Sequence, residues 1–391
     1  MAEPNTADES VQEESFVAPR RPLTWVNGGW LLGLLALASI GAMASLLVLW
    51  PRHRGDGQNP ETYGFDLRHT VLTPGGARIV AGGMPRDYLQ ALDDPEMITP
   101  AQVERLNTQG HYNKFLLPQD RIIGVVIGGA ARAYPIKSMV YHEVVNDTVG
   151  SDGGGQPIVV TYSALCDSTA VFERTLGGHA VRFGVSGLLY NSNLLFYDRI
   201  EGGVGGGDGP AGRVGGESLW SQLEARALAG PRAGETLQLL PCAVVRWENW
   251  LAEHPDTRVM APNPQTEKLL GEISYATYYA SDQLKFPVEP AWKDRGLPAK
   301  TPVLAIRIGA QDATSRWKVF VLPRLDALTE AQRRAVLDVP GVRLSWYPGD
   351  SHGVPPALET DGTDSARPIT CVYSFIFAFN AAHLGAYDLV P

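Results

Sequence analysis

Cysteine is scarce in this chain of 391 residues, which contains only Cys166, Cys242 and Cys371. An odd and sparse set of cysteines does not make a disulfide framework, although one pair could form in an oxidising compartment. The sequence also has no CxxC pair, so nothing in it indicates a zinc ribbon or a thioredoxin-like site.

Basic residues are also fewer than acidic residues. Lys and Arg together number 33 against 42 Asp and Glu, which gives a formal net charge of -9. Binding to phosphate requires a basic surface, so this balance argues against nucleic acid as the main partner and against broad adhesion to anionic lipid. The glycine-rich segment 201–216 lacks the GKS or GKT ending of a phosphate-binding loop, and it predicts a flexible insertion.

One long run without charge is present, WLLGLLALASIGAMASLLVLW at residues 30–50. As a helix, this run would be about 31 Å long, which matches a hydrocarbon core of ~30 Å. Trp30 and Trp50 bracket it, as aromatic residues do at membrane interfaces. We therefore expect one transmembrane helix that places the chain in a lipid bilayer. The alternative is a cleaved signal peptide, but the preceding leader is long and begins with acidic residues.

Small residues share one face of this predicted helix at the spacing i, i+3, i+4 and i+7: Ala38, Gly41, Ala42 and Ser45. Such a face permits close helix packing, so a homodimer through the membrane helix is one expectation, and a face that arises by chance is the alternative. Basic residues flank the run on both sides in nearly equal number, so charge alone does not fix the orientation.

The uncharged run divides the chain into four predicted segments. Residues 1–29 are polar and acidic, which predicts a disordered tail, and residues 30–50 form the membrane helix. Residues 51–62 read as a linker, and residues 63–391 form a β-rich globular domain.

Apolar runs rich in β-branched residues predict strands in the globular domain. Gly128-Gly129 and Gly177-Gly178 each separate two such runs, which indicates two hairpins. Other segments have helical character, and the expected helices are 137–147, 244–253 and 325–337.

The order strand, strand, helix, strand occurs twice in these predictions. It runs through residues 122–162 and again through residues 303–346. This repetition favours an α+β fold, β-rich and built from two related halves at 63–260 and 261–391, after one N-terminal transmembrane helix.

Two polar clusters could carry chemistry. Tyr141-His142-Glu143 lies in the predicted helix 137–147, and the segment from Tyr162 to Ser168 directly follows a predicted strand. Residues just past the end of a strand often line a site, because the sheet holds them rigidly. Only one short strand separates His142 from Cys166, so their side chains could meet.

Three interpretations of this pair remain open. In the first, His142 and Cys166, with Asp167, bind copper or zinc, since thiolate and imidazole suit these metals. In the second, Cys166 is a catalytic nucleophile activated by His142 and oriented by Asn146 or Asp167, as in a hydrolase or transferase. In the third, Cys166 and His142 are buried structural residues of a non-catalytic interaction domain.

A third polar cluster lies in FGVSGLLYNSNLLFYDR at residues 183–199. It contains Asn191, Ser192 and Asp198 among apolar neighbours, and buried polar groups must find partners. These side chains either line a cofactor-binding pocket or cap turns.

Several long runs resemble one bacterial family. They are GGMPRDYLQALDDP, ARAYPIKSMVYHEVVNDTVG, QPIVVTYSALCDSTAVFER, FGVSGLLYNSNLLFYDR and SLWSQLEARALAGPRAG, and together they are similar to the domain-of-unknown-function 3179 family over residues 78–310. Members often look exported or membrane-anchored, so the resemblance implies an extracytoplasmic domain. Members typically carry TYCPLC where this chain has Ser163 in place of the first cysteine, which argues against a two-thiolate metal site here. The resemblance leaves a binding or redox-accessory module as the expected function.

Overall fold

The computed structural model separates the chain into two compact units, residues 1–52 and 53–391, which are described in turn. The ranges that it describes are 29–49, 55–72, 77–109, 114–150, 154–200, 216–266, 274–293, 296–308, 316–339, 342, 344–347, 357–360 and 369–390. The predicted disordered tail and nearly all of the glycine-rich segment 201–216 lie outside these ranges.

The first unit contains helix α1 (Gly29–Leu49), which covers all but the last residue of the predicted membrane run. Within the described ranges, no helix meets the length and hydropathy required of a membrane span. Membrane insertion of this segment stays a prediction. The second unit begins its regular structure with the 3-10 helix η2 (Pro60–Tyr63), where the predicted linker ends.

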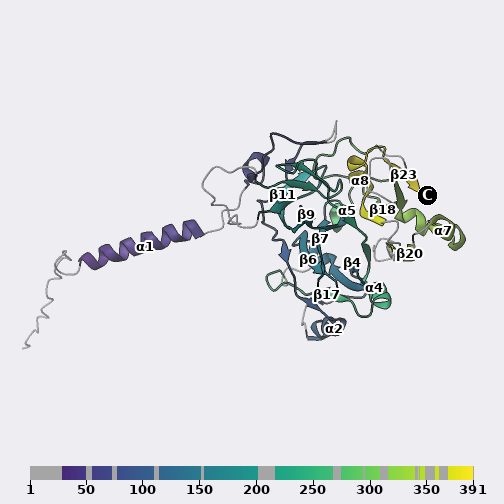
Figure 1. The fold of residues 1–391 in the computed structure, drawn as a ribbon, viewed down its shortest axis with the longest axis horizontal. Coiled ribbons are helices and arrows are strands. Elements are labelled where there is room, and N and C mark those ends of the chain that lie inside the picture. The colour runs from purple at the N-terminus through teal and green to yellow at the C-terminus, as the bar shows by residue number, and fades with distance from the viewer. Residues whose placement is uncertain are drawn as a thin grey trace, which may run out of the picture. The chain divides into compact units, whose positions relative to one another are not determined.

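The second unit is built on one large, mixed sheet of nine strands (Figure 1). Its order along the sheet is β2 (Leu92–Asp93), β6 (Val144–Val149), β7 (Gln156–Ser163), β8 (Ser168–Glu173), β22 (Ile369–Phe375), β18 (Pro302–Ile308), β19 (Trp317–Val321) and β23 (Tyr387–Val390), with β15 (Leu239–Leu240) also paired to β8. The sequence prediction of a β-rich α+β fold is therefore confirmed for the globular domain.

Two five-stranded sheets accompany the large one. The first has the order β1 (Val80–Ala81), β11 (Arg182–Tyr190), β12 (Asn193–Arg199), β13 (Leu219–Ser221) and β14 (Arg226–Ala229). The second has the order β16 (Ala243–Arg246), β4 (Arg121–Ile127), β5 (Ala130–Pro135), β17 (Arg258–Met260) and β3 (Met97–Ile98). Two-stranded pairs are formed by β9 (Thr175–Leu176) with β10 (His179–Ala180), and by β20 (Leu344–Tyr347) with β21 (Ala357–Thr360).

The two five-stranded sheets cover opposite faces of the large sheet. Val159 of β7 packs in the core shared with β11 and β12, whereas Ile158 and Val160 pack in the core shared with β4 and β5. Successive side chains of a strand point to opposite faces, so β7 is buried on both sides. This explains why its sequence is a continuous apolar run rather than an alternating one.

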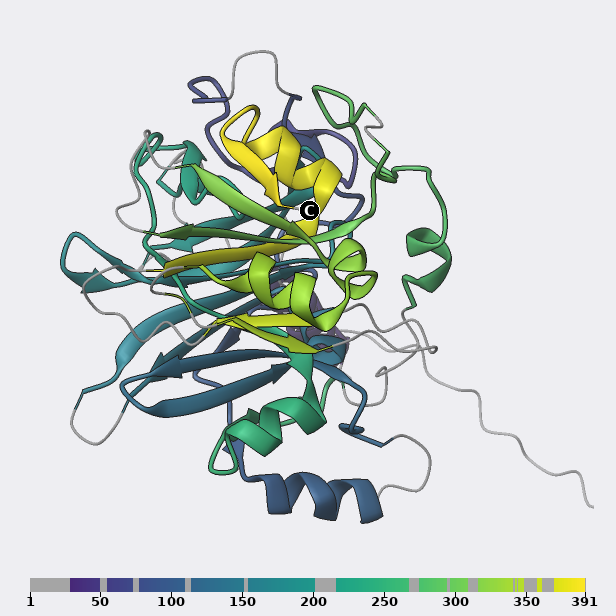
Figure 2. The ribbon, with the colours of Figure 1, turned by 90° about the vertical axis from the view of Figure 1, so that its right-hand side faces the viewer.

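Helices α2 (Pro100–Gln109) and α4 (Trp247–Glu253) cover the outer face of the β4–β5 sheet (Figure 2). Trp250 of α4 is buried directly over Gly124 of β4, where an added Cβ would lie 2.3 Å from the indole ring. Only glycine leaves room for this approach. The aromatic side chain therefore fixes where α4 packs on the sheet.

Both predicted glycine hairpins are confirmed. Strands β4 and β5 are antiparallel on either side of Gly128-Gly129, and β9 and β10 flank Gly177-Gly178 in the same way. All four glycines have positive φ, as the turns of such hairpins require.

The predicted helix at 137–147 is wrong for most of its length. Only α3 (Ile136–Met139) is helical, and Val144–Val149 forms strand β6, paired with β7 from Val144 to Val149. The β-branched residues of this segment favour a strand when a partner is available, and β7 supplies that partner. The left-handed backbone of Glu143, with φ of 56°, separates the turn from the strand.

The two proposed halves share one sheet, since β22 pairs with both β18 and β8. The order of two strands and a short helix recurs as β4, β5, α3 and as β18, β19, α6 (Leu322–Asp326). The two copies are placed differently, however, because β4–β5 and β18–β19 belong to different sheets. The predicted helix 325–337 is interrupted, with α7 (Glu330–Leu337) starting at the expected capping box of Thr329 and Gln332. Duplication stays a prediction.

Candidate functional site

His142 is almost fully buried, with 2% of its surface exposed. Its Nδ1 lies 2.8 Å from the carbonyl oxygen of Gln90, and its Nε2 lies 3.3 Å from Oγ1 of Thr266. A carbonyl only accepts, so Nδ1 carries the proton and Nε2 accepts from the threonine hydroxyl. Burial lowers the pKa of His142, which keeps the ring neutral, and both of its nitrogens have partners.

Cys166 lies in the turn between β7 and β8 and has no exposed surface. Its thiol donates to the carbonyl oxygen of Ser192 at 3.1 Å. Burial raises the pKa of the Cys166 thiol to about 12, so the thiolate needed for nucleophilic attack is scarce at neutral pH.

The contacts of the described residues do not join His142 to Cys166, and their shared pocket stays a prediction. The third metal ligand proposed from the sequence, Asp167, is bound by Arg121. Among the described residues, no three His, Cys, Asp or Glu side chains gather into a group that could hold a metal. Because Asp167 is paired with Arg121 and both nitrogens of His142 have partners, copper or zinc binding by these residues stays a prediction.

Asn191 and Ser192 form the tight turn between β11 and β12, with φ of 52° and 63°. These values are typical of a two-residue hairpin turn, in which asparagine is favoured. Within the described ranges, the side-chain nitrogen of Asn191 has no hydrogen-bond partner. Asp198, at the other end of β12, accepts from the Ser218 amide at 2.5 Å and pairs with Arg232. The structure therefore does not bring Asp198 together with the turn.

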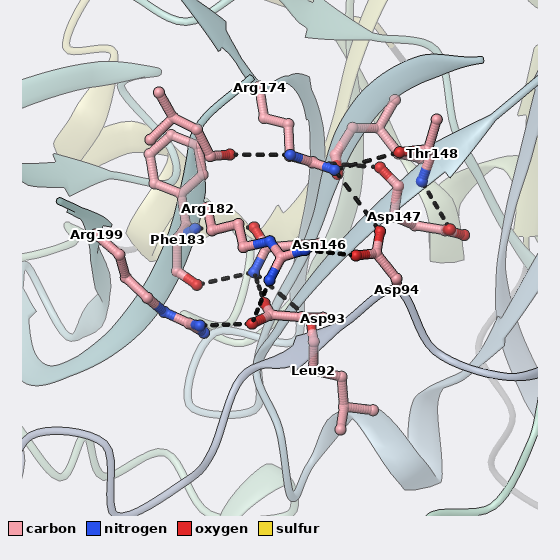
Figure 3. A network of polar contacts seen from close by, with 12 residues as sticks. Leu92, Asp93, Asp94, Asn146, Asp147, Thr148, Arg174, Arg182, Phe183 and Arg199 are labelled. Atoms are coloured by element: carbon pink, nitrogen blue, oxygen red, sulfur yellow. Dashed lines mark hydrogen bonds and ion pairs between the residues drawn. The ribbon is translucent and has the colours of Figure 1, made fainter. Parts of the chain in front are cut away.

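Asn146 belongs to a separate polar network that does not include His142 or Cys166 (Figure 3). Its side chain donates to the Phe183 carbonyl at 2.9 Å and accepts from the Phe183 amide at 2.8 Å. It also donates to Asp93, which pairs with Arg199 at 2.7 Å. The network ties β2 and β6 to the sheet of β11 and β12, so it acts as a structural clamp.

A different group of side chains gathers at the end of β7 and has the character of a site. We call it the tyrosine–carboxylate site, and its members are Arg121, Glu143, Tyr162, Asp167, Tyr275 and Tyr279. Tyr162 is buried, whereas the other five retain partial exposure. They come from the start of β4, the end of β7, the turns before β6 and after β7, and α5 (Ala276–Tyr279) with its preceding residue.

The charged part of this site is a paired arginine and aspartate. Two nitrogens of Arg121 contact the two carboxylate oxygens of Asp167 at 2.7 and 2.9 Å. The Tyr162 hydroxyl donates to the same carboxylate at 2.8 Å. Burial alone would raise the pKa of Asp167, but the Arg121 charge and these hydrogen bonds outweigh burial and lower it. Asp167 is therefore ionised at neutral pH.

The carboxyl group of Glu143 differs from that of Asp167 in its protonation state. Its backbone is left-handed, with φ of 56°, which is rare and costly for a residue with a long side chain. Among the described residues, no hydrogen bond to its carboxyl group is formed. Burial raises the pKa of Glu143 to about 8, so the carboxyl group is largely protonated at neutral pH. Two carboxyl groups with pKa values shifted apart are a frequent property of functional sites.

Two tyrosines connect the carboxyl groups. Tyr275 and Tyr279 stack with ring centroids 6.0 Å apart, and the Tyr279 hydroxyl lies 3.3 Å from that of Tyr162. Burial raises the pKa of Tyr275, and the nearby Glu143 carboxyl raises it further. The Tyr279 hydroxyl also donates to the carbonyl of Ala164, in the turn that follows β7.

Tyr279 also lines a cavity of about 440 Å³. Its lining includes Asp282, Lys300 and Arg324 as well as Tyr279. This volume lies within the range of small-molecule sites. Tyr279 therefore borders both the cavity and the tyrosine–carboxylate site.

The sequence prediction placed a site after the end of β7 and named Asp167, but it missed Arg121, Tyr275 and Tyr279. The run YATYY at residues 275–279 is an aromatic concentration that could have drawn attention to α5. Nothing local marks Arg121, because only folding brings β4 beside the Asp167 turn.

Comparison with known proteins gives one match. The family model described as "Protein of unknown function (DUF3179)" matches residues 86–324, which include every residue of the tyrosine–carboxylate site. Searches of curated proteins and of solved structures give no match.

Proposed function

The chain belongs to the DUF3179 family of proteins of unknown function, and we propose that its globular domain binds a small polar molecule at the tyrosine–carboxylate site. The state of the Glu143 carboxyl group carries this proposal. Glu143 is a partly exposed residue, burial of its carboxyl group raises the pKa to about 8, and the carboxyl group has no hydrogen-bond partner in the described part of the chain. A neutral carboxyl group in such a setting donates a hydrogen bond to an oxygen of a ligand.

The rest of the site supports a ligand of this kind. The Arg121–Asp167 pair and Tyr162 supply polar groups held in place by one another, since Arg121 and the Tyr162 hydroxyl both bind the Asp167 carboxylate. The stacked rings of Tyr275 and Tyr279 add apolar surface that carries two hydroxyl groups. The ligand class that fits is an uncharged or anionic molecule with carbonyl, carboxylate or hydroxyl oxygens, such as a short carboxylate or a monosaccharide.

The test uses the purified full-length chain and ligand-observed NMR with acetate, lactate, glucose and N-acetylglucosamine as probes. We expect at least one probe to bind at pH 6.5 and to lose affinity at pH 9.5, where Glu143 is ionised. E143Q should bind equally at both pH values, because its amide is a neutral donor throughout. E143A should bind at neither pH.

Glu104, which is exposed on α2, provides the matched control, and E104Q should behave like the unchanged chain. A probe that retains the same pH dependence in E143Q would contradict the role of Glu143. A probe that binds E143A as tightly as the unchanged chain would place the ligand elsewhere.

We also propose that residues 30–50 anchor the domain in a bilayer and that the domain faces the extracytoplasmic side. The uncharged run with tryptophan at both ends supports the anchor, and the exported or anchored character of similar family members supports the orientation. The chain should remain in the membrane pellet after alkaline carbonate extraction, and protease added outside intact cells or spheroplasts should cleave the domain. Release into the soluble fraction would contradict the anchor.

A further inference from the structure

Two of the three cysteines lie against each other in the interior. Cys242 directly precedes β16, Cys371 lies in β22, and their sulfur atoms are 3.8 Å apart. Both side chains are buried, with 2% and 0% of their surfaces exposed. The pair therefore lies between the nine-stranded sheet and the β4–β5 sheet, with 129 positions of chain between the two residues.

The local backbone holds these two sulfur atoms in place. The Cys242 amide donates to the Cys371 sulfur at 3.2 Å, and the Cys371 thiol donates back to the Cys242 carbonyl at 3.1 Å. A disulfide has an S–S distance of about 2.05 Å, so closing the bond requires the sulfur atoms to approach by about 1.8 Å.

We propose that Cys242 and Cys371 form a modification site, a dithiol that closes into a disulfide and covalently links the two sheets. The third cysteine is excluded from this bond by its position. Cys166 packs in the core between the large sheet and β11, whereas Cys242 and Cys371 pack in the core on the opposite face. The fold therefore specifies one pairing out of three.

The oxidant is a small-molecule disulfide such as oxidised glutathione. The Cys371 thiolate attacks one glutathione sulfur, forms a mixed disulfide and releases one glutathione thiolate. The Cys242 thiolate then attacks the Cys371 sulfur and releases the second glutathione. Two cysteine S–H bonds are lost, one S–S bond forms, and the oxidant is reduced to two thiols.

The hydrogen bonds favour Cys371 as the first attacking sulfur. The Cys242 thiol and the Cys242 amide both hydrogen-bond to the Cys371 sulfur and lower the pKa of Cys371. Because both residues are buried in the folded domain, the bond forms most readily while the sheets are assembling. This inference does not depend on the proposed ligand site.

The test refolds the reduced, denatured full-length chain in a buffer of reduced and oxidised glutathione. The chain is then unfolded in acid, alkylated and analysed by peptide mass spectrometry. We expect one alkylated cysteine, Cys166, and one cross-linked peptide joining Cys242 to Cys371. A sample kept in dithiothreitol should carry three alkylated cysteines.

C166S should form the same cross-link, and C242A/C371A should form none. As a second measurement, chain refolded with oxidised glutathione should melt at a higher temperature than chain refolded in dithiothreitol, and this difference should vanish in C242A/C371A. Three alkylated cysteines after refolding with oxidised glutathione, or a cross-link that includes Cys166, would overturn the proposal.

Discussion

The backbone amide of Tyr162 donates a hydrogen bond at 2.8 Å to the carbonyl oxygen of Glu143. This bond extends the pairing of β6 and β7 by one residue beyond β6, into a position with left-handed backbone. The sheet therefore holds Glu143 in a conformation that a glutamate rarely adopts, beside the residue whose hydroxyl binds Asp167.

Glu143 predicts a pH dependence of stability. Its pKa is about 8 in the folded chain, against an ordinary value of 4.5, so the folded state holds the proton that the unfolded state loses between these values. The free energy of unfolding should therefore fall as pH rises from about 5 to 8, by at most about 1.4 kcal/mol per pH unit, and less because the side chain is partly exposed. Urea unfolding of the unchanged chain and of E143Q measures this slope.

In E143Q this part of the slope should disappear, because an amide does not titrate in this range. E104Q, at an exposed position of α2, should keep the slope of the unchanged chain. Equal slopes in E143Q and the unchanged chain would show that the Glu143 carboxyl group is solvated like an exposed one.

The Arg121–Asp167 pair predicts a strong coupling between two mutations. R121M leaves the largely buried Asp167 carboxylate without its counter-charge, and we expect a loss of about 3 to 5 kcal/mol in the free energy of unfolding. The double variant R121M/D167N should recover part of this loss, since neither charge remains buried. Guanidinium unfolding of the two single variants and the double variant measures the coupling. Additive losses would contradict a direct interaction.

Cys166 predicts resistance to alkylation. Burial raises the pKa of its thiol to about 12, so iodoacetamide at pH 8 should modify it at least tenfold more slowly in the folded chain than in urea. Peptide mass spectrometry follows Cys166 separately from the other two cysteines. Rapid modification near pH 6 would instead support the interpretation of Cys166 as an activated nucleophile.

Replacing Asn146 should lower the stability of the domain but leave the tyrosine–carboxylate site intact. N146A removes both hydrogen bonds to the Phe183 backbone and leaves that buried amide and carbonyl without these partners. We expect the free energy of unfolding to fall by about 2 to 3 kcal/mol. N263A, in a surface turn, should cost less. If N146A bound the probes of the tyrosine–carboxylate site no more weakly than the unchanged chain, the clamp and the site would be separate, as the contacts indicate.

Local signals in the sequence were sufficient to predict the two hairpins. Gly128-Gly129 can adopt the left-handed conformations that the turn between β4 and β5 requires, and the flanking apolar runs have the length of strands. The helix expected at 137–147 failed for a different reason. Its residues allow either structure, and β7, which decides the outcome by pairing with Val144–Val149, lies outside the window.

The candidate site also depends on residues that are distant in the sequence, and it was therefore predicted only in part. Its location past the end of β7 was predicted, because that end is marked by an apolar run followed by polar residues. Its composition was not, since Arg121 and Tyr279 lie 46 and 117 positions from the residues that they contact. The protonation of Glu143 follows from burial, which a single sequence does not reveal.

Strand β22 lies between β8 and β18, although its residues 369–375 follow β8 by almost 200 positions. During synthesis, the edge of β8 that pairs with β22 stays open until residues 369–375 have left the ribosome. In an unfinished chain, the backbone amides and carbonyls at this edge of β8 are unpaired and can pair with another molecule. A fragment limited to the family-matched residues 86–324 would carry the same open edge, so premature termination should yield aggregates rather than a smaller working domain.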